Sequence, residues 1–88
     1  MIDVDSLKIT PKVRALLIYF LANEGKPLQR SRLLVDVWGM KPTTETRSVD
    51  THVGWVRKAI RPFGYTITHS QKGYTLVPPE TAPQAELR

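Results

Sequence analysis

The chain contains no cysteine, which excludes disulfide bonds and thiolate metal sites. No apolar run approaches the roughly 20 residues of a membrane-spanning helix, and the first residues, MIDVDS, lack the basic and apolar regions of a signal peptide. The two histidines form no recognisable zinc motif. We therefore expect a cytoplasmic protein without a membrane association, a metal site or a cofactor.

Residues arranged for catalysis are also missing from the sequence. Asp50 and His52 are two positions apart, and residues at this spacing do not face each other on a helix. His69 and Ser70 have no recognisable acid partner. With 88 residues the chain has room for one small domain with one core. We predict that the protein is not an enzyme.

Positive charge is concentrated in one part of the chain. The formal net charge is +5, and residues 46–77 carry five basic side chains but only one acidic side chain. Such a local basic excess is typical of proteins that bind nucleic acid. Basic side chains that merely keep the domain soluble would explain the total charge equally well, but they explain its concentration less well.

The segment 46–61, TRSVDTHVGWVRKAIR, is predicted to form an amphipathic helix. Its apolar residues recur at spacings of four, three and four, which places them on one stripe. They are Val49, Val53, Val56 and Ile60. The opposite side, at roughly 100° per residue, carries Arg47, Ser48, Thr51, Trp55 and Lys58. The major groove of DNA admits one α-helix, so we interpret this segment as a recognition helix.

Two helices are predicted before this segment, and a hairpin after it. The first begins at Pro11, after the N-cap Thr10, and places Val13, Leu16, Leu17, Phe20 and Leu21 on its core side. The second runs over residues 30–38, with Leu33, Leu34, Val37 and Trp38 inside. Residues 65–68 and 74–77 alternate as the strands of a β-hairpin around a loop at 69–73, and residues 7–9 could add one short strand.

This order of elements predicts an α+β winged helix-turn-helix, and the residues resemble the OmpR/PhoB-type DNA-binding domain of bacterial response regulators. The resemblance covers residues 7–77. It rests on Ile9-Thr10-Pro11-Lys12, Leu16-Leu17, Arg30 with Leu33-Leu34, Val37-Trp38-Gly39, Arg47-x-Val49-Asp50-x-His52-Val53-x-x-Val56-Arg57-Lys58 and Gly73-Tyr74. The N-terminal strand region is shortened, and we expect no receiver domain within these 88 residues. We expect a domain at 1–77 and a disordered tail or linker at 78–88, which holds three prolines.

The resemblance implies that the third helix enters the major groove and that the wing touches the minor groove. It implies DNA contacts for Arg47, Ser48, His52, Arg57 and Lys58, and it leaves Lys72 as the cation of the wing. The loop between the second and third helices is implied to contact RNA polymerase. Its residues are Met40, Lys41, Pro42, Thr43, Thr44 and Glu45.

Several of these residues also allow other roles. Arg47 fits a guanine edge, a phosphate, or a surface ion pair with Glu45 or Asp50. Asp50 would be repelled by phosphate, so it is expected to orient Arg47 or another basic neighbour. Ser48 and Thr51 either contact DNA or face solvent. Arg30 and Arg32 are candidate phosphate contacts from the second helix.

His52 and Trp55 each allow more than one kind of contact. His52 is either a DNA contact or a packed structural histidine. Trp55 lies opposite the valine stripe, where it could pack on thymine methyl groups and sugars, meet a partner protein, or fold back under the wing. Trp38 is expected in the core.

The function predicted from these features is sequence-specific binding of double-stranded DNA by a transcriptional regulator. Two copies are expected on half-sites about one helical turn apart. The alternative is a winged-helix protein-interaction module, an inhibitor or assembly factor that uses the exposed Trp55 face. A weaker alternative is an architectural or excision factor for mobile DNA.

Overall fold

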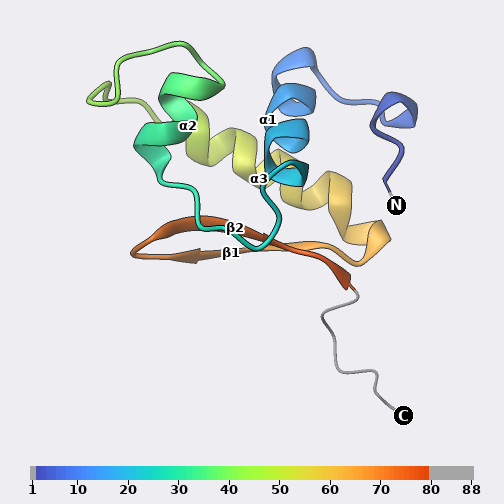
Figure 1. Cartoon of the computed structure of the whole chain (residues 1–88). Coiled ribbons are helices and arrows are strands. Elements are labelled where there is room, and N and C mark those ends of the chain that lie inside the picture. Colours follow the sequence, from blue (N-terminus) through green and yellow to red (C-terminus); the bar gives the residue numbers. More distant parts are fainter. Residues whose placement is uncertain (1, 80–88) are drawn as a thin grey trace.

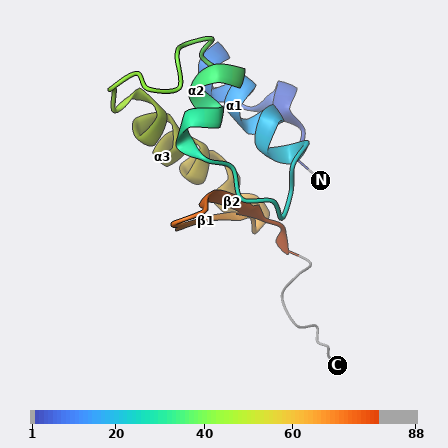
Figure 2. The same cartoon turned by 60° about the vertical axis from the view of Figure 1, so that its left-hand side comes forward.

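Three α-helices lie above a β-hairpin in the structure, a computed structural model that describes residues 2–79 (Figure 1). Turned by 60°, the hairpin still lies below the helices, so the two parts form separate layers (Figure 2). This arrangement confirms the predicted α+β winged helix-turn-helix. Most of the proposed tail at 78–88 lies outside the described residues.

Helix α1, Pro11–Leu21, begins and packs as the sequence predicts. The Thr10 hydroxyl accepts a hydrogen bond from the amide of Val13 at 3.3 Å, which satisfies one of the first free N–H groups of the helix. The core side of α1 is fully buried except for the partly buried Leu21. The helix therefore provides a fixed support for α3.

Helix α2, Arg30–Asp36, is shorter than the predicted 30–38. Gly39 adopts a left-handed conformation with φ of +67°, and the amide of Met40 donates to the carbonyl of Leu34 at 2.9 Å. This hydrogen bond and the left-handed glycine end the helix before Trp38. Trp38 is partly buried and packs against the core. Gln29 makes no side-chain cap, as expected for a weak N-cap residue.

The strand predicted at residues 7–9 is wrong. The first element is instead a short 3-10 turn, η1, at Val4–Ser6. A strand needs a neighbour with free N–H and C=O groups, and the N-terminal segment lies beside α1, away from the hairpin (Figure 1). Leu7 and Ile9 therefore pack against the core as irregular chain, and Ile2 is buried.

Helix α3, Ser48–Ile60, lies in the centre of the molecule and buries the predicted apolar stripe. Val49, Val53, Val56 and Ile60 are each at most 1% exposed. The helix begins two residues later than predicted, and the hydroxyl of Thr46 accepts from the amide of Ser48 at 3.1 Å. After a 3-10 turn, η2 at Arg61–Phe63, Gly64 reverses the chain with φ of +83°.

The hairpin consists of β1, Thr66–Ser70, and β2, Gly73–Val77. Ser70 pairs with Gly73, so the turn is the two residues 71–72 and is tighter than the predicted loop. Leu28 adds an antiparallel bridge to Tyr74, with hydrogen bonds of 2.8 and 2.9 Å in the two directions. The link between α1 and α2 thereby holds the wing against the helices.

Gly73 is required by this bridge. Its φ is +120°, and a Cβ placed on it would lie 2.2 Å from the carbonyl oxygen of Leu28. Neither the backbone conformation nor the space suits any other residue. The wing and the α1–α2 link meet at a point that only glycine can occupy.

Candidate nucleic-acid interface

The side of α3 opposite the core carries exposed polar and aromatic side chains. Arg47, Thr51 and Lys58 are exposed, and Trp55 is 47% exposed. Ser48 is half-buried at the start of the helix. Since the buried valine stripe fixes the rotation of the helix, these side chains cannot turn inward. The structure thus brings together most of the α3 residues that the sequence predicts to contact DNA.

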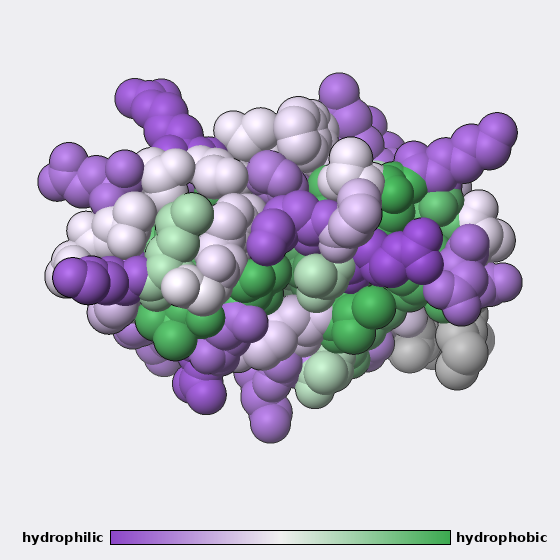
Figure 3. Space-filling model, turned by 90° about the horizontal axis from the view of Figure 1, so that it is seen from above, coloured by the Kyte–Doolittle hydropathy of each residue, from purple (hydrophilic) through white to green (hydrophobic). Residues whose placement is uncertain are grey.

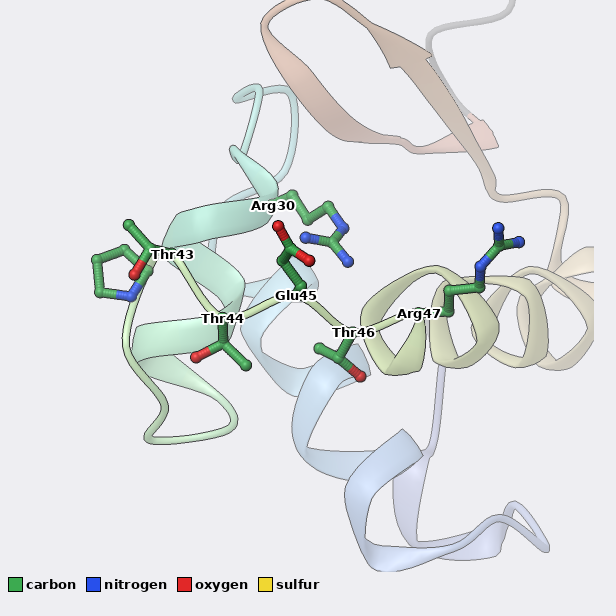
Figure 4. A pocket seen from close by; sticks show the side chains of 7 residues that line it. Arg30, Thr43, Thr44, Glu45, Thr46 and Arg47 are labelled. Atoms are coloured by element: carbon green, nitrogen blue, oxygen red, sulfur yellow. The ribbon is translucent and has the colours of Figure 1, made fainter.

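Arg47 and Arg30 line one cavity of about 480 Å³ with the loop that precedes α3. The cavity is lined by Arg30, Pro42, Thr43, Thr44, Glu45, Thr46 and Arg47. Arg30, Glu45 and Arg47 extend to one side of the loop, and Thr44 and Thr46 extend to the other (Figure 4). Arg47 makes no ion pair with the residues that the structure describes, so two arginines and one carboxylate set the charge of this cavity.

Asp50 pairs with Arg30 rather than with Arg47. The Arg30 Nε lies 3.4 Å from the Asp50 carboxylate, whose other oxygen accepts a hydrogen bond from the Tyr74 hydroxyl. One side chain of α3 is therefore joined to both α2 and β2. Burial of Tyr74, and then its hydrogen bond to Asp50, raise the pKa of the phenol to about 12.

Arg57 is turned toward the wing. Its Nε donates to the carbonyl of Ile67 in β1 at 3.2 Å, and the guanidinium lies 6.0 Å from the ring centre of Tyr74. The side chain is half-buried. The contacts of Arg57 thus join the second half of α3 to both strands of the hairpin.

His52 packs between two tryptophans. Its ring centre is 5.2 Å from that of Trp38 and 4.8 Å from that of Trp55, and both contacts are edge-to-face. The Nδ1 atom is 2.7 Å from the carbonyl oxygen of Ser48, so the ring is also fixed to its own helix. Lys12 extends this row, with its Nζ 5.4 Å from the Trp38 ring centre. His52 is a packed residue at the edge of the exposed side of α3.

The tip of the hairpin lies beside the start of α2. Residues of both, including Gln29, Arg30, Ser70 and Gln71, line a cavity of about 270 Å³. Lys72 is exposed in the turn, where its amide donates to the Ser70 hydroxyl at 3.2 Å. Arg30 borders both this cavity and the one at the α3 loop, and it connects the two regions.

Arg32 is separated from these groups by its own partner. It forms an i, i+4 ion pair with Asp36 at 3.5 Å, and its side chain is 66% exposed. Asp36 also accepts a hydrogen bond from Tyr19, which raises the pKa of that phenol. Arg32 belongs to a surface network between α1 and α2 rather than to the cavities beside α3.

The upper face of the molecule is mixed in polarity. Small hydrophobic areas alternate with hydrophilic side chains that project from the rim (Figure 3). Within residues 2–79, no helix is long and apolar enough to cross a membrane. No group of three or more His, Asp or Glu side chains in that range is placed to hold a metal ion.

A comparison with known families identifies the chain's relatives. The family model described as "Transcriptional regulatory protein, C terminal" matches residues 5–76. The chain belongs to this family. The resemblance to the OmpR/PhoB-type DNA-binding domain is thereby confirmed, and the family points to a DNA-binding regulator rather than to an enzyme.

Two relatives show the extent of the similarity. Response regulator ArlR of Staphylococcus saprophyticus is 33% identical over 63 residues, which cover 72% of this chain and 29% of ArlR. The phosphate regulon transcriptional regulatory protein PhoB of Escherichia coli is 34% identical over 61 residues, which cover 69% of this chain and 27% of PhoB. The chain therefore matches less than a third of the length of each of these regulators.

Sequence reasoning missed the contacts that fix the wing of this family member. It found Gly73 and Tyr74 only as a motif, and it did not pair Tyr74 with Asp50 or Leu28. The available signal was a lone acidic residue within an otherwise basic segment. Such a residue needs a local partner, and a tyrosine hydroxyl is as suitable as an arginine.

Proposed function

We propose that this domain binds double-stranded DNA sequence-specifically, with α3 in the major groove and the wing against the minor groove or the backbone. A helix with one side buried in the core presents its other side as a rigid surface of groove width. The exposed side of α3 is basic and aromatic, which suits both phosphates and base edges. The proposed outcome of binding is regulation of transcription.

The observation that carries this proposal is the connection between α3 and the wing. Tyr74 bonds to Asp50, and Arg57 bonds to Ile67, so the hairpin has a defined position relative to the helix. Lys72 at its tip is therefore held at a fixed offset from α3. Two rigidly related elements can contact two adjacent grooves in one register.

The geometry suggests a division of roles among the residues. Arg47 and Arg30 share a cavity suited to a backbone phosphate, and Lys58 and Lys72 supply further cations. Ser48, Thr51 and Trp55 are proposed to meet base edges and thymine methyl groups. His52 and Arg57 are proposed to act by positioning their neighbours, since both are held by contacts within the protein.

Further parts of the proposal concern assembly. Two copies would occupy half-sites about one helical turn apart, as two-fold regulators do. The exposed loop at residues 40–45 would contact RNA polymerase in the cytoplasm. Residues 1–77 would form the DNA-binding unit, and residues 78–88 would serve as a linker or tail.

Selection of bound sequences from a random duplex pool tests specificity and half-site spacing together. With the selected duplex, Arg47→Ala and Lys58→Ala should weaken binding and should each reduce the slope of log K against log salt by about one. Arg14→Ala serves as the control. It also removes one positive charge, but from α1, where Arg14 forms a surface ion pair with Asp5. Unchanged affinity and slope for both α3 variants would contradict the proposed face. Absence of any salt-sensitive binding would favour the protein-interaction module.

A further inference from the structure

A third concave site lies beside the second half of α3, away from Arg47. The segment before α1, the first turn of α1 and the second half of α3 form a groove of about 420 Å³. Its lining includes Ile9 and Val13 on one side and Trp55, Lys58 and Ala59 on the other, with Lys8 at the rim. Sites for small molecules in proteins commonly have volumes of about 300–1,000 Å³, so the groove has the size of such a site.

The surface of this groove is mainly apolar. Val13 is nearly fully buried, and Ile9 and Ala59 are partly buried, so they form an aliphatic floor. Trp55 forms a wall that is 47% exposed, which leaves much of the indole free for contact. The hydroxyl of Thr10, which also borders the groove, already accepts from the amide of Val13. An apolar group would therefore meet mainly carbon atoms in this groove.

The charge at the rim has one sign. Lys8 and Lys58 come from opposite sides of the groove, and both side chains are exposed. Neither forms an ion pair with the part of the chain that the structure describes. Their ammonium groups therefore remain available to an outside anion, and charge-assisted hydrogen bonds to a carboxylate are among the stronger ones in proteins.

We propose that this groove binds a small amphipathic carboxylate, with its ring or chain against Trp55, Val13 and Ala59 and its carboxylate between Lys8 and Lys58. The apolar floor accounts for the hydrophobic part of the ligand, and the two exposed lysines account for the anionic part. Neither feature alone would distinguish this ligand from a plain anion or a neutral hydrophobic molecule.

Occupancy of the groove would compete with DNA if the proposed function holds. Trp55 and Lys58 line the groove and also belong to the proposed DNA surface. A ligand that covers the indole and neutralises Lys58 removes both from that surface. A small carboxylate would then lower the affinity of the domain for DNA.

The test is a titration of the full chain with 2-naphthoate in the absence of DNA. Binding is monitored through the NMR signals of the indole N–H groups. The resonance of Trp55 should shift in a saturable way, whereas that of Trp38, which does not line the groove, should shift little. Lys8→Ala and Lys58→Ala should each weaken binding by about three- to fivefold, as expected for one exposed charge of a pair. Lys26→Ala removes a charge from an exposed site in the α1–α2 link, away from the groove, and should bind as the parent does.

Two further probes separate the ligand classes. Neutral 2-naphthol should bind more weakly than 2-naphthoate, and inorganic phosphate should leave the Trp55 resonance unchanged. Equal binding of naphthol, a phosphate-induced shift of the same size, or no saturable shift with naphthoate would each overturn the proposal. Naphthoate binding by a chain that fails to bind DNA would support the groove while contradicting the proposed function. If DNA is bound, naphthoate should weaken that binding.

Discussion

Tyr74 on β2 donates its phenolic hydrogen to the carboxylate of Asp50 on the first turn of α3. The same carboxylate forms an ion pair with Arg30 of α2, so the Asp50 side chain joins the wing to both helices of the helix-turn-helix. The orientation of the wing is thus set by a polar contact near the start of α3, in addition to the shared core.

Tyr74→Phe should loosen this connection without removing the ring from the core. We expect a loss of about 1–2 kcal/mol in the free energy of unfolding, the usual cost when a partly buried polar group loses its partner. Urea denaturation monitored by circular dichroism measures it. Affinity for the selected DNA should fall as well, because the tip of the hairpin is less firmly placed. A variant as stable as the parent would show that the hydrogen bond contributes nothing to folding.

Alkaline pH should destabilise the domain through Tyr74. The pKa of this phenol is raised from the ordinary 10.0 to about 12, so its proton is held more tightly in the folded chain than in the unfolded chain. The contribution is complete below pH 10 and is lost as the pH rises toward 12. Urea midpoints across this window should fall more steeply for the parent than for Tyr74→Phe. Parallel profiles would contradict the raised pKa.

Gly73→Ala should be among the most damaging single substitutions. The added methyl group would lie 2.2 Å from the Leu28 carbonyl oxygen, at a φ of +120° that alanine rarely adopts. We expect a loss of about 3 kcal/mol or more, because both the clash and the backbone strain must be relieved. The measurement is again a urea midpoint.

Gly54→Ala provides the matched comparison. A Cβ at this position on α3 meets no atom within 4 Å, and the residue is helical. Replacement of glycine by alanine in a helix should therefore stabilise the domain by about 0.5–1 kcal/mol. If both glycine variants lost stability equally, the close approach at Leu28 would not be the cause.

Glu45→Gln should strengthen DNA binding if the arginine cavity contacts a phosphate. Within residues 2–79, Glu45 is the one acidic side chain that lines the cavity of Arg30 and Arg47, and it extends to the same side of the loop as they do (Figure 4). Its removal should improve affinity by about two- to fivefold at low salt, with a smaller gain at high salt. Fluorescence anisotropy with labelled duplex measures it. Glu24→Gln, at an exposed site after α1, should change affinity less.

The helices could be predicted from the sequence because their signals are local. The stripe of Val49, Val53, Val56 and Ile60 identified α3 and its buried side, and Thr10 with Pro11 located the start of α1. Such patterns depend only on the period of the helix and on the needs of its first turn. The exposed position of Trp55 followed from the same period.

The remaining features depend on contacts between residues distant in sequence. Residues 7–9 alternate as a strand does, but no strand in the described part of the chain lies beside them. The pattern within the segment cannot show whether such a neighbour exists. Arg57 and Lys58 are adjacent and both cationic, yet Arg57 is bonded to the wing while Lys58 is exposed. Their difference arises from where the hairpin packs, 10 residues further along the chain.

The bridge between Leu28 and Tyr74 has a consequence for association between copies. It closes part of the outer side of β2. Further along the same side, the amide of Gly25 donates a hydrogen bond to the carbonyl of Leu76. The open edge of the wing is therefore β1, where the Ile67 carbonyl is already occupied by Arg57. A second copy that extended this sheet by adding a strand at Ile67 would first have to displace that arginine. Arg57 of α3 thus hinders edge-to-edge pairing of the wing with a second copy.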